Sequence, residues 1–298
     1  MREHSASRTA AWVAGARGLG AFLPEDEQLV RDPFGLSFGG LMAKGLGRVL
    51  APLPPNVAST LLRPLAPAAG VYWMQLRTRV IDREVEAFVA SGGAQVVILG
   101  AGFDCRAFRL DALRGARVFE IDHPATQKVK RAHMDAVSPL AASVDFVPWD
   151  FEARPVGALP GALAALGHDP DRPTLTIWEG VTMYLSEDAI DATVRAVSAL
   201  GRGAPSTLVF NYFEHDAVVK KNRGLRWAVA ALGEPFKFGW RPEELAPWFA
   251  ARGFDVRMDR QDVELAAELL PHVRHPFRTQ GRHIVVAEHV RARARSSR

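Results

Sequence analysis

The sequence predicts an α/β protein with a doubly wound, mostly parallel sheet of seven strands and a helical segment before it. From about residue 90 onward, short runs rich in β-branched and aromatic residues alternate with amphipathic helical patterns. This alternation is typical of a parallel sheet that is covered by helices on both faces. Before residue 90, Pro and Gly interrupt apolar helical patterns, as in "LAPLPPNVASTLLRPLAPAAG" (50–70).

Short β-rich runs mark the expected strands, and helical patterns lie between most of them. The strands are Gln95–Leu99, Arg117–Ile121, Val144–Val147, Thr174–Trp178, Thr207–Tyr212, Phe254–Met258 and His283–Glu288. The helical patterns include Ala125–Ala136, Glu187–Leu200 and Pro242–Arg252. The stretch between the last two strands (260–282) has no strong crossover helix, so we expect the sheet to end in an antiparallel strand.

Length and composition favour one large unit. The chain has 298 residues, of which nearly half are apolar. We expect a single domain over 1–298, with an N-terminal helical cap (1–90), a core (91–290) that carries a lid insertion at about 213–240, and a basic tail (291–298). No apolar run approaches the roughly 20 residues of a membrane span. The stretch 10–21, broken by Arg17 and three glycines, is a poor secretory signal, so we expect a cytoplasmic protein with no membrane partner.

Charge and cysteine content exclude further classes of partner. The net charge is +4 and the basic residues are spread among acidic ones, so we expect no nucleic-acid partner. The densest basic run, "VRARARSSR" (290–298), is typical of a solvated tail. The single cysteine, Cys105, excludes an internal disulfide and a cysteine-based zinc site, and no metal is expected.

The first strand runs into a glycine turn at Gly100-Ala101-Gly102. Glycines at this place let the backbone turn sharply and approach a ligand closely. A dinucleotide fingerprint requires a third glycine, but Cys105 stands at that position. The chain also lacks a glycine-rich phosphate loop ending in Lys-Ser or Lys-Thr. The turn alone therefore indicates either a ligand loop or a purely structural turn.

Acidic residues stand at the ends of the next three strands. Asp122 follows Gly102 by twenty residues, Asp150 precedes Phe151 after the third strand, and Glu179 ends the fourth. Each acid alone is typical of a helix cap or a solvated loop. Together, at the carboxyl edge of an open sheet, they indicate an adenosine pocket with a spare carboxylate for a cation. A ligand with a positive centre and no phosphates fits best, and S-adenosylmethionine is such a ligand.

Four motifs carry a resemblance to a known family: "RTRVID" (77–82), "LGAGFDCRAFRL" (99–110), "EIDHPATQKVKR" (120–131) and "WEGVTMYL" (178–185), with a weaker match at "RDPFG" (31–35). The chain resembles the leucine carboxyl methyltransferase family over roughly residues 8 to 290. It is most similar to the family's bacterial branch, whose members are considered S-adenosylmethionine-dependent methyltransferases and are often encoded near natural-product genes.

The resemblance implies a class I methyltransferase fold with a helical cap over the cofactor. It assigns the methionine carboxylate to Arg77, the ribose to Asp122, and the adenine side to Asp150 and Phe151. His123 is expected to support the ribose site rather than to act in catalysis. The full set of implied cofactor contacts is Arg77, Gly100, Ala101, Gly102, Asp122, His123, Asp150, Phe151, Glu179 and Gly180.

The sequence departs from the family pattern at one position, and it does not decide which residue is the N-terminal basic one. The family has Asp-Thr-Arg or Asp-Ser-Arg after the glycine turn, whereas this chain has Asp-Cys-Arg, and we expect Cys105 to be a packing residue. Some members place an N-terminal basic residue near the cofactor, and Arg8 and Arg17 are both candidates here.

The acceptor side is less well specified. Methyl transfer is an in-line displacement that depends mainly on orientation. An ionised carboxylate acceptor needs no base, whereas a phenol, amine or ring carbon benefits from one. Tyr184 and His215 are the candidate catalytic residues, and a surface position is the alternative for His215. A lid rich in aromatic and basic residues, together with the cap aromatics, either covers the acceptor or belongs to the ordinary core. These cap aromatics are Trp12, Phe22, Phe34, Phe38, Tyr72 and Trp73.

The sequence predicts an S-adenosylmethionine-dependent enzyme that O-methylates a carboxyl or hydroxyl group of a small metabolite or peptide. The alternative within the class is C- or N-methylation of an aromatic natural product with a base such as His215. A nicotinamide oxidoreductase is disfavoured because the third glycine is missing. The alternative that is not an enzyme is a cofactor-binding regulatory module, which predicts that the basic tail is required for function.

Overall fold

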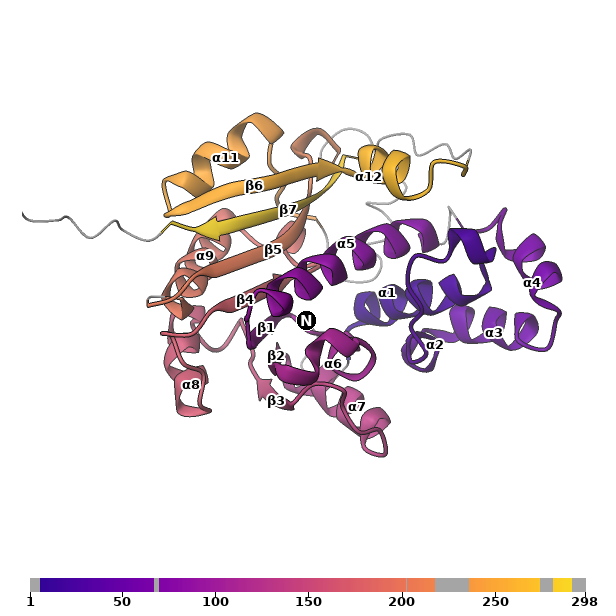
Figure 1. Cartoon of the computed structure of the whole chain (residues 1–298), viewed down its shortest axis with the longest axis horizontal. Coiled ribbons are helices and arrows are strands. Elements are labelled where there is room, and N and C mark those ends of the chain that lie inside the picture. The colour runs from indigo at the N-terminus through magenta and orange to yellow at the C-terminus, as the bar shows by residue number, and fades with distance from the viewer. Residues whose placement is uncertain (1–5, 67–69, 202, 218–235, 274–280, 291–298) are drawn as a thin grey trace, which may run out of the picture.

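The structure is a computed structural model that describes residues 6–66, 70–201, 203–217, 236–273 and 281–290 (Figure 1). Its centre is a seven-stranded sheet. The strands are β1 (Gln95–Leu99), β2 (Arg117–Asp122), β3 (Ser143–Pro148), β4 (Thr174–Trp178), β5 (Ser206–Phe213), β6 (Phe254–Gln261) and β7 (Arg282–His289). All seven expected strands are present, and β1 and β4 have the expected limits.

The strand order is β3-β2-β1-β4-β5-β7-β6. The first five strands are mutually parallel, and β7 runs antiparallel between β5 and β6. The expected antiparallel strand is therefore confirmed. Because the chain leaves β1 toward β2 and returns to β4 on its other side, the strand order reverses beside β1. Open α/β sheets bind ligands at the carboxyl edge of such a reversal.

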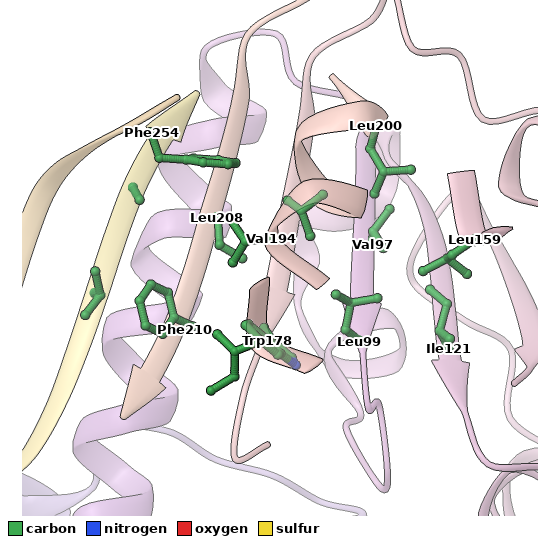
Figure 2. Close-up of a cluster of buried hydrophobic side chains, with 14 of the residues drawn as sticks. Val97, Leu99, Ile121, Leu159, Trp178, Val194, Leu200, Leu208, Phe210 and Phe254 are labelled. Carbon is green, nitrogen blue, oxygen red and sulfur yellow. The ribbon is translucent and has the colours of Figure 1, made fainter. Parts of the chain in front are cut away.

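Helices α8 (Leu159–Ala165), α9 (Glu187–Leu200) and α11 (Pro242–Ala250) cover one face of the sheet. Side chains of α9 such as Val194 pack there against Val97 of β1 (Figure 2). Every residue of β1 is buried, which explains the apolar run that follows Gln95 in this strand.

On the opposite face lie α5 (Val71–Ala90), α6 (Arg106–Arg109) and α7 (Pro124–Met134). Alternate residues of one strand point to opposite faces. Val96 and Ile98 of β1 therefore pack with Ile81 of α5, in a cluster separate from that of Val97.

The N-terminal cap consists of α1 (Arg8–Leu19), α2 (Gly35–Phe38), α3 (Leu41–Leu50) and α4 (Pro55–Leu62). Figure 1 shows these helices together at one end, with α5 running from them along the sheet. The cap shares a third hydrophobic cluster with α12 (Asp262–Leu269), a short helix between β6 and β7 that the sequence analysis did not predict. Short 3-10 helices join the larger elements: η1 (Gly20–Phe22), η2 (Glu25–Glu27), η3 (Asp111–Gly115), η4 (Val156–Ala158) and η5 (Thr182–Tyr184).

Two predicted features lie largely outside the described residues. They are the lid at about 213–240, of which 218–235 is not described, and the basic tail at 291–298. Within the described ranges, no helix combines the length and apolar character needed to cross a bilayer.

Candidate functional site

A cavity of about 520 Å³ opens at the carboxyl edge of the sheet, below the first turns of α1. All ten residues that the sequence analysis assigned to a cofactor line it, and so does Tyr184. They are Arg77, Gly100, Ala101, Gly102, Asp122, His123, Asp150, Phe151, Glu179 and Gly180. The structure thus brings together residues from five separate segments of the chain.

The glycine turn forms the floor of the cavity. Gly100 and Gly102 have φ values of 66° and 48°, in the left-handed region that disfavours side chains. A Cβ on Gly100 would lie only 2.7 Å from Cγ2 of Val181. One on Gly102 would lie 3.1 Å from Cβ of Ala10 in the cap. The turn therefore needs glycine, and it leaves backbone open to a ligand.

Asp122 ends β2 beside this turn. One of its oxygens accepts a hydrogen bond from the N–H of Gly102, and the other accepts one from the N–H of His123 at 2.6 Å. Burial raises the pKa of Asp122, against the effect of these two bonds. Each carboxylate oxygen can accept a second bond, so the fixed carboxylate can still receive both hydroxyls of a ribose.

His123 and Asp150 lie side by side at the next strand end. Nδ1 of His123 accepts the N–H of Ala125 at 3.2 Å and caps α7, which places the proton of a neutral ring on Nε2. That nitrogen is 3.8 Å from Oδ2 of Asp150. The N–H of Glu152 fixes Oδ1 of Asp150 at 2.9 Å. Phe151 beside it is 41% exposed, so its ring is available for stacking.

Glu179, at the end of β4, is held between two arginines. Nε of Arg77 lies 2.7 Å from one carboxylate oxygen, and Nη1 of Arg106 lies 2.7 Å from the other. Burial disfavours the charge of Glu179, but the two guanidinium groups outweigh it and keep its pKa well below the usual range. Among the described residues, the terminal nitrogens of Arg77 have no hydrogen-bond or ion-pair partner, so they can form a fork to a ligand carboxylate.

Arg106 belongs to a buried charge network that the sequence analysis missed. It pairs with Asp104, and its Nε lies 2.7 Å from Oδ1 of Asp82. Nη1 of Arg109 lies 2.7 Å from Oδ2 of the same Asp82. The available signal was the unusual density of charge in two otherwise apolar motifs, "RTRVID" and "FDCRAFRL".

The structure distinguishes the two N-terminal basic candidates. Arg17 is buried and lines the cavity, whereas Arg8 is exposed and does not. Nη2 of Arg17 donates to the carbonyl of Phe103 at 2.7 Å, and its Nε bonds Asp32. Burial opposes the charge of Arg17, but Asp32 outweighs it and raises the pKa. This arginine connects the cap to the glycine turn.

Cys105 is buried, and its Sγ lies 3.5 Å from the carbonyl oxygen of Phe103. Burial raises the pKa of the thiol to about 12. A thiol that stays protonated is a poor nucleophile. The packing role expected for Cys105 is confirmed.

The two candidate catalytic residues occupy different places. Tyr184, in η5, lines the cavity with its ring centre 5.6 Å from that of Phe236. His215 is exposed and does not line the cavity, and its N–H donates to the carbonyl of Trp240 at 2.9 Å. No cap aromatic lines the described cavity either: Phe22, Phe34, Phe38, Tyr72 and Trp73 pack in hydrophobic clusters, and Trp12 is exposed.

Comparisons with known proteins show the family to which this chain belongs. The sequence model of the family described as leucine carboxyl methyltransferase matches residues 10–198. A relative from Frankia alni, named as a candidate S-adenosyl-L-methionine-dependent methyltransferase, is 36% identical over 193 residues, which span 64% of this chain and 64% of the relative. A relative of the same description from Streptomyces coelicolor is 33% identical over 83% of this chain and 82% of its own.

Among solved structures, a candidate methyltransferase from Thermobifida fusca is similar with a TM-score of 0.50 and 19% identity, over 92% of this chain and 97% of its own. That likeness concerns the fold, which is the class I methyltransferase fold. The family match includes most of the cap, the glycine turn and the ends of β1, β2, β3 and β4. The chain belongs to the leucine carboxyl methyltransferase family.

Proposed function

We propose that this protein is an S-adenosylmethionine-dependent methyltransferase that O-methylates a carboxyl or hydroxyl group of a small metabolite or peptide. The observation that carries the proposal is the convergence of all ten expected cofactor residues on one cavity. The names of the relatives point to the same cofactor. The exposed position of His215, outside the cavity lining, gives no support to a reaction that needs this base.

The residues fit the parts of this cofactor. The free fork of Arg77 would hold the methionine carboxylate, and Asp122 would accept from the ribose hydroxyls. Asp150 and Phe151 would receive the adenine, by hydrogen bonding and by stacking. Glu179 already binds two arginines, so it would position Arg77 rather than serve only as a free carboxylate for a cation.

With a carboxylate acceptor the reaction needs little acid–base chemistry from the protein, whereas a hydroxyl acceptor would also have to release its proton to a base or to solvent. When bound, the cofactor supplies a methyl group on a sulfonium, which an acceptor oxygen can attack as the carbon–sulfur bond breaks. The fixed turn, the buried arginines and the cap would orient the reactants and exclude water, effects that can together provide about 7–11 kcal/mol. A carboxylate acceptor is already ionised at neutral pH and needs no base.

A matched pair of variants tests the cofactor site. Asp122→Ala removes the expected ribose acceptor, so S-adenosylmethionine should bind more weakly by about 1.5–3 kcal/mol in calorimetry. The control is Asp111→Ala. The Asp111 side chain is 77% exposed and does not line the cavity, so this variant should bind the cofactor as wild type does. Because Asp122 also fixes Gly102, thermal unfolding of both variants must show a folded protein. Equal affinities in folded Asp122→Ala and wild type would contradict the assignment.

A further inference from the structure

One side of the cavity contains residues that the cofactor assignment does not use. They come from the connection between β4 and α9, from the first turn of α9 and from the chain before α11. Val181, Leu185 and Ala189 are apolar, Tyr184 and Ser186 carry hydroxyls, and Lys237 carries a charge. This side follows Gly180, the last of the residues assigned to the cofactor, so it would be available to an acceptor.

Backbone and ring contacts fix the position of Lys237. Its N–H donates to the carbonyl of Met183 at 2.7 Å, which ties the segment to η5. The ring of the preceding Phe236 lies 5.6 Å from Tyr184 and 5.1 Å from Phe213, centre to centre. The ring of the following Phe238 lies 4.8 Å from Trp240. The lysine is therefore held at the cavity from both sides.

Lys237 has no ion-pair partner among the described residues, although carboxylates also line the cavity. They are Asp104, which pairs with Arg106, Asp122 and Asp150, which accept backbone N–H groups, Glu152, and Glu179. Arg17 pairs with Asp32, and Arg77 pairs with Glu179. Among the residues that the structure describes, no carboxylate lies within 4.0 Å of Lys237, although it lines the same cavity. An ammonium that is held at a partly closed site and has no ion-pair partner can pair with the anionic group of a ligand.

We propose that Lys237 is a specificity-determining residue whose ammonium selects acceptors that carry a carboxylate or phosphate group. This inference rests on the proposed function, because it treats the remaining cavity as cofactor space. The anionic group need not be the atom that is methylated. The apolar residues Val181 and Leu185 would contact the body of such an acceptor, and Lys237 would fix its charged end.

Calorimetry on protein saturated with S-adenosylhomocysteine tests the inference. The probes are benzoate, phenylacetate and phenyl phosphate, with benzamide and phenylacetamide as neutral counterparts. Wild type should bind at least one acid, and the amides more weakly. Lys237→Gln should lower the affinity for that acid by about 10- to 100-fold, and Lys237→Arg should retain most of this affinity. Lys128→Gln removes the same charge from an exposed position outside the cavity lining and should behave as wild type.

The possible outcomes separate the two proposals. Failure of wild type to bind S-adenosylhomocysteine, measured first, would remove the proposed function and this inference with it. If wild type binds S-adenosylhomocysteine normally, three results would overturn the inference and leave the proposed function intact. These are that no acid binds, that amides bind as well as acids, or that Lys237→Gln binds acids as tightly as wild type does. Weaker S-adenosylhomocysteine binding by Lys237→Gln would make the lysine a cofactor contact and would overturn it too. The probe whose affinity depends on Lys237, either phenyl phosphate or a carboxylate, identifies the anionic group that this lysine selects.

Discussion

At the scale of single residues, Glu179 illustrates how a buried charge is stabilised in this site. Its side chain is 10% exposed, and those of Arg77 and Arg106 are 5% and 1% exposed. A buried carboxylate is costly unless it is paired and hydrogen-bonded, and both of its oxygens meet a guanidinium nitrogen. The pairing fixes Arg77, so the geometry of the expected carboxylate fork depends on Glu179.

Replacing this carboxylate by an amide should be strongly destabilising. Glu179→Gln keeps the shape but leaves two buried guanidinium groups short of negative charge, and the free energy of unfolding should fall by about 3–5 kcal/mol. Glu86→Gln breaks an ion pair with Arg79 that is more exposed, with side-chain exposures of 38% for Glu86 and 29% for Arg79. It should lower the free energy of unfolding by less than about 1 kcal/mol. Urea unfolding of both variants at neutral pH measures the difference. Similar losses would show that Glu179 is no more important than a surface partner.

At the scale of secondary-structure elements, the ends of β5, β6 and β7 are joined by a buried histidine. Nδ1 of His283 lies 2.7 Å from Oδ1 of Asp259, and its Nε2 lies 3.1 Å from Oε1 of Glu214. The Tyr212 ring stacks on the imidazole at 4.6 Å, and its hydroxyl donates to Asp259 at 3.0 Å. Both ring nitrogens face carboxylates, an arrangement that favours the imidazolium form, in which both nitrogens donate.

This cluster predicts a loss of stability on the alkaline side. Burial lowers the pKa of His283, but Asp259 and Glu214 outweigh it and raise the pKa above the usual 6.5. A raised folded pKa gives stability that is fully present below the unfolded value and is lost as pH rises through the folded value. The loss should be about 1.4 kcal/mol per pH unit between those two values. The free energy of unfolding, measured from pH 5.5 to 9, should fall less in His283→Gln than in wild type. Parallel curves would contradict the assignment.

Elements differ in how far the sequence specifies them. β1 and β4 are wholly buried, and their sequences, QVVIL and TLTIW, are dominated by β-branched and large apolar residues that mark them as strands. β6 extends three residues beyond Met258, because its polar end pairs with β7 and carries Asp259. The glycine turn and the acids could be predicted because each stands at a strand end or within two residues of it. The partners of Arg106 lie up to 73 positions away, and only the packed fold brings them together.

At the scale of the whole molecule, cap and core form the site jointly. Ala10 approaches the glycine turn, and Arg17 reaches from α1 to the carbonyl of Phe103. The cap also shares a hydrophobic cluster with α12 at the other end of the chain (Figure 1). The cofactor cavity thus depends on segments from both ends of the sequence. We therefore propose that 1–298 is a single domain, in which the cap closes a site that the sheet provides.

The cofactor is the central claim of this account, and calorimetry of the wild-type protein tests it most directly. Separate titrations would use S-adenosylmethionine, S-adenosylhomocysteine and NAD(H). The account predicts saturable binding of the first two and none of NAD(H), because the turn lacks the third glycine and Cys105 stands in its place. Binding of NAD(H) without binding of either sulfur compound would contradict it.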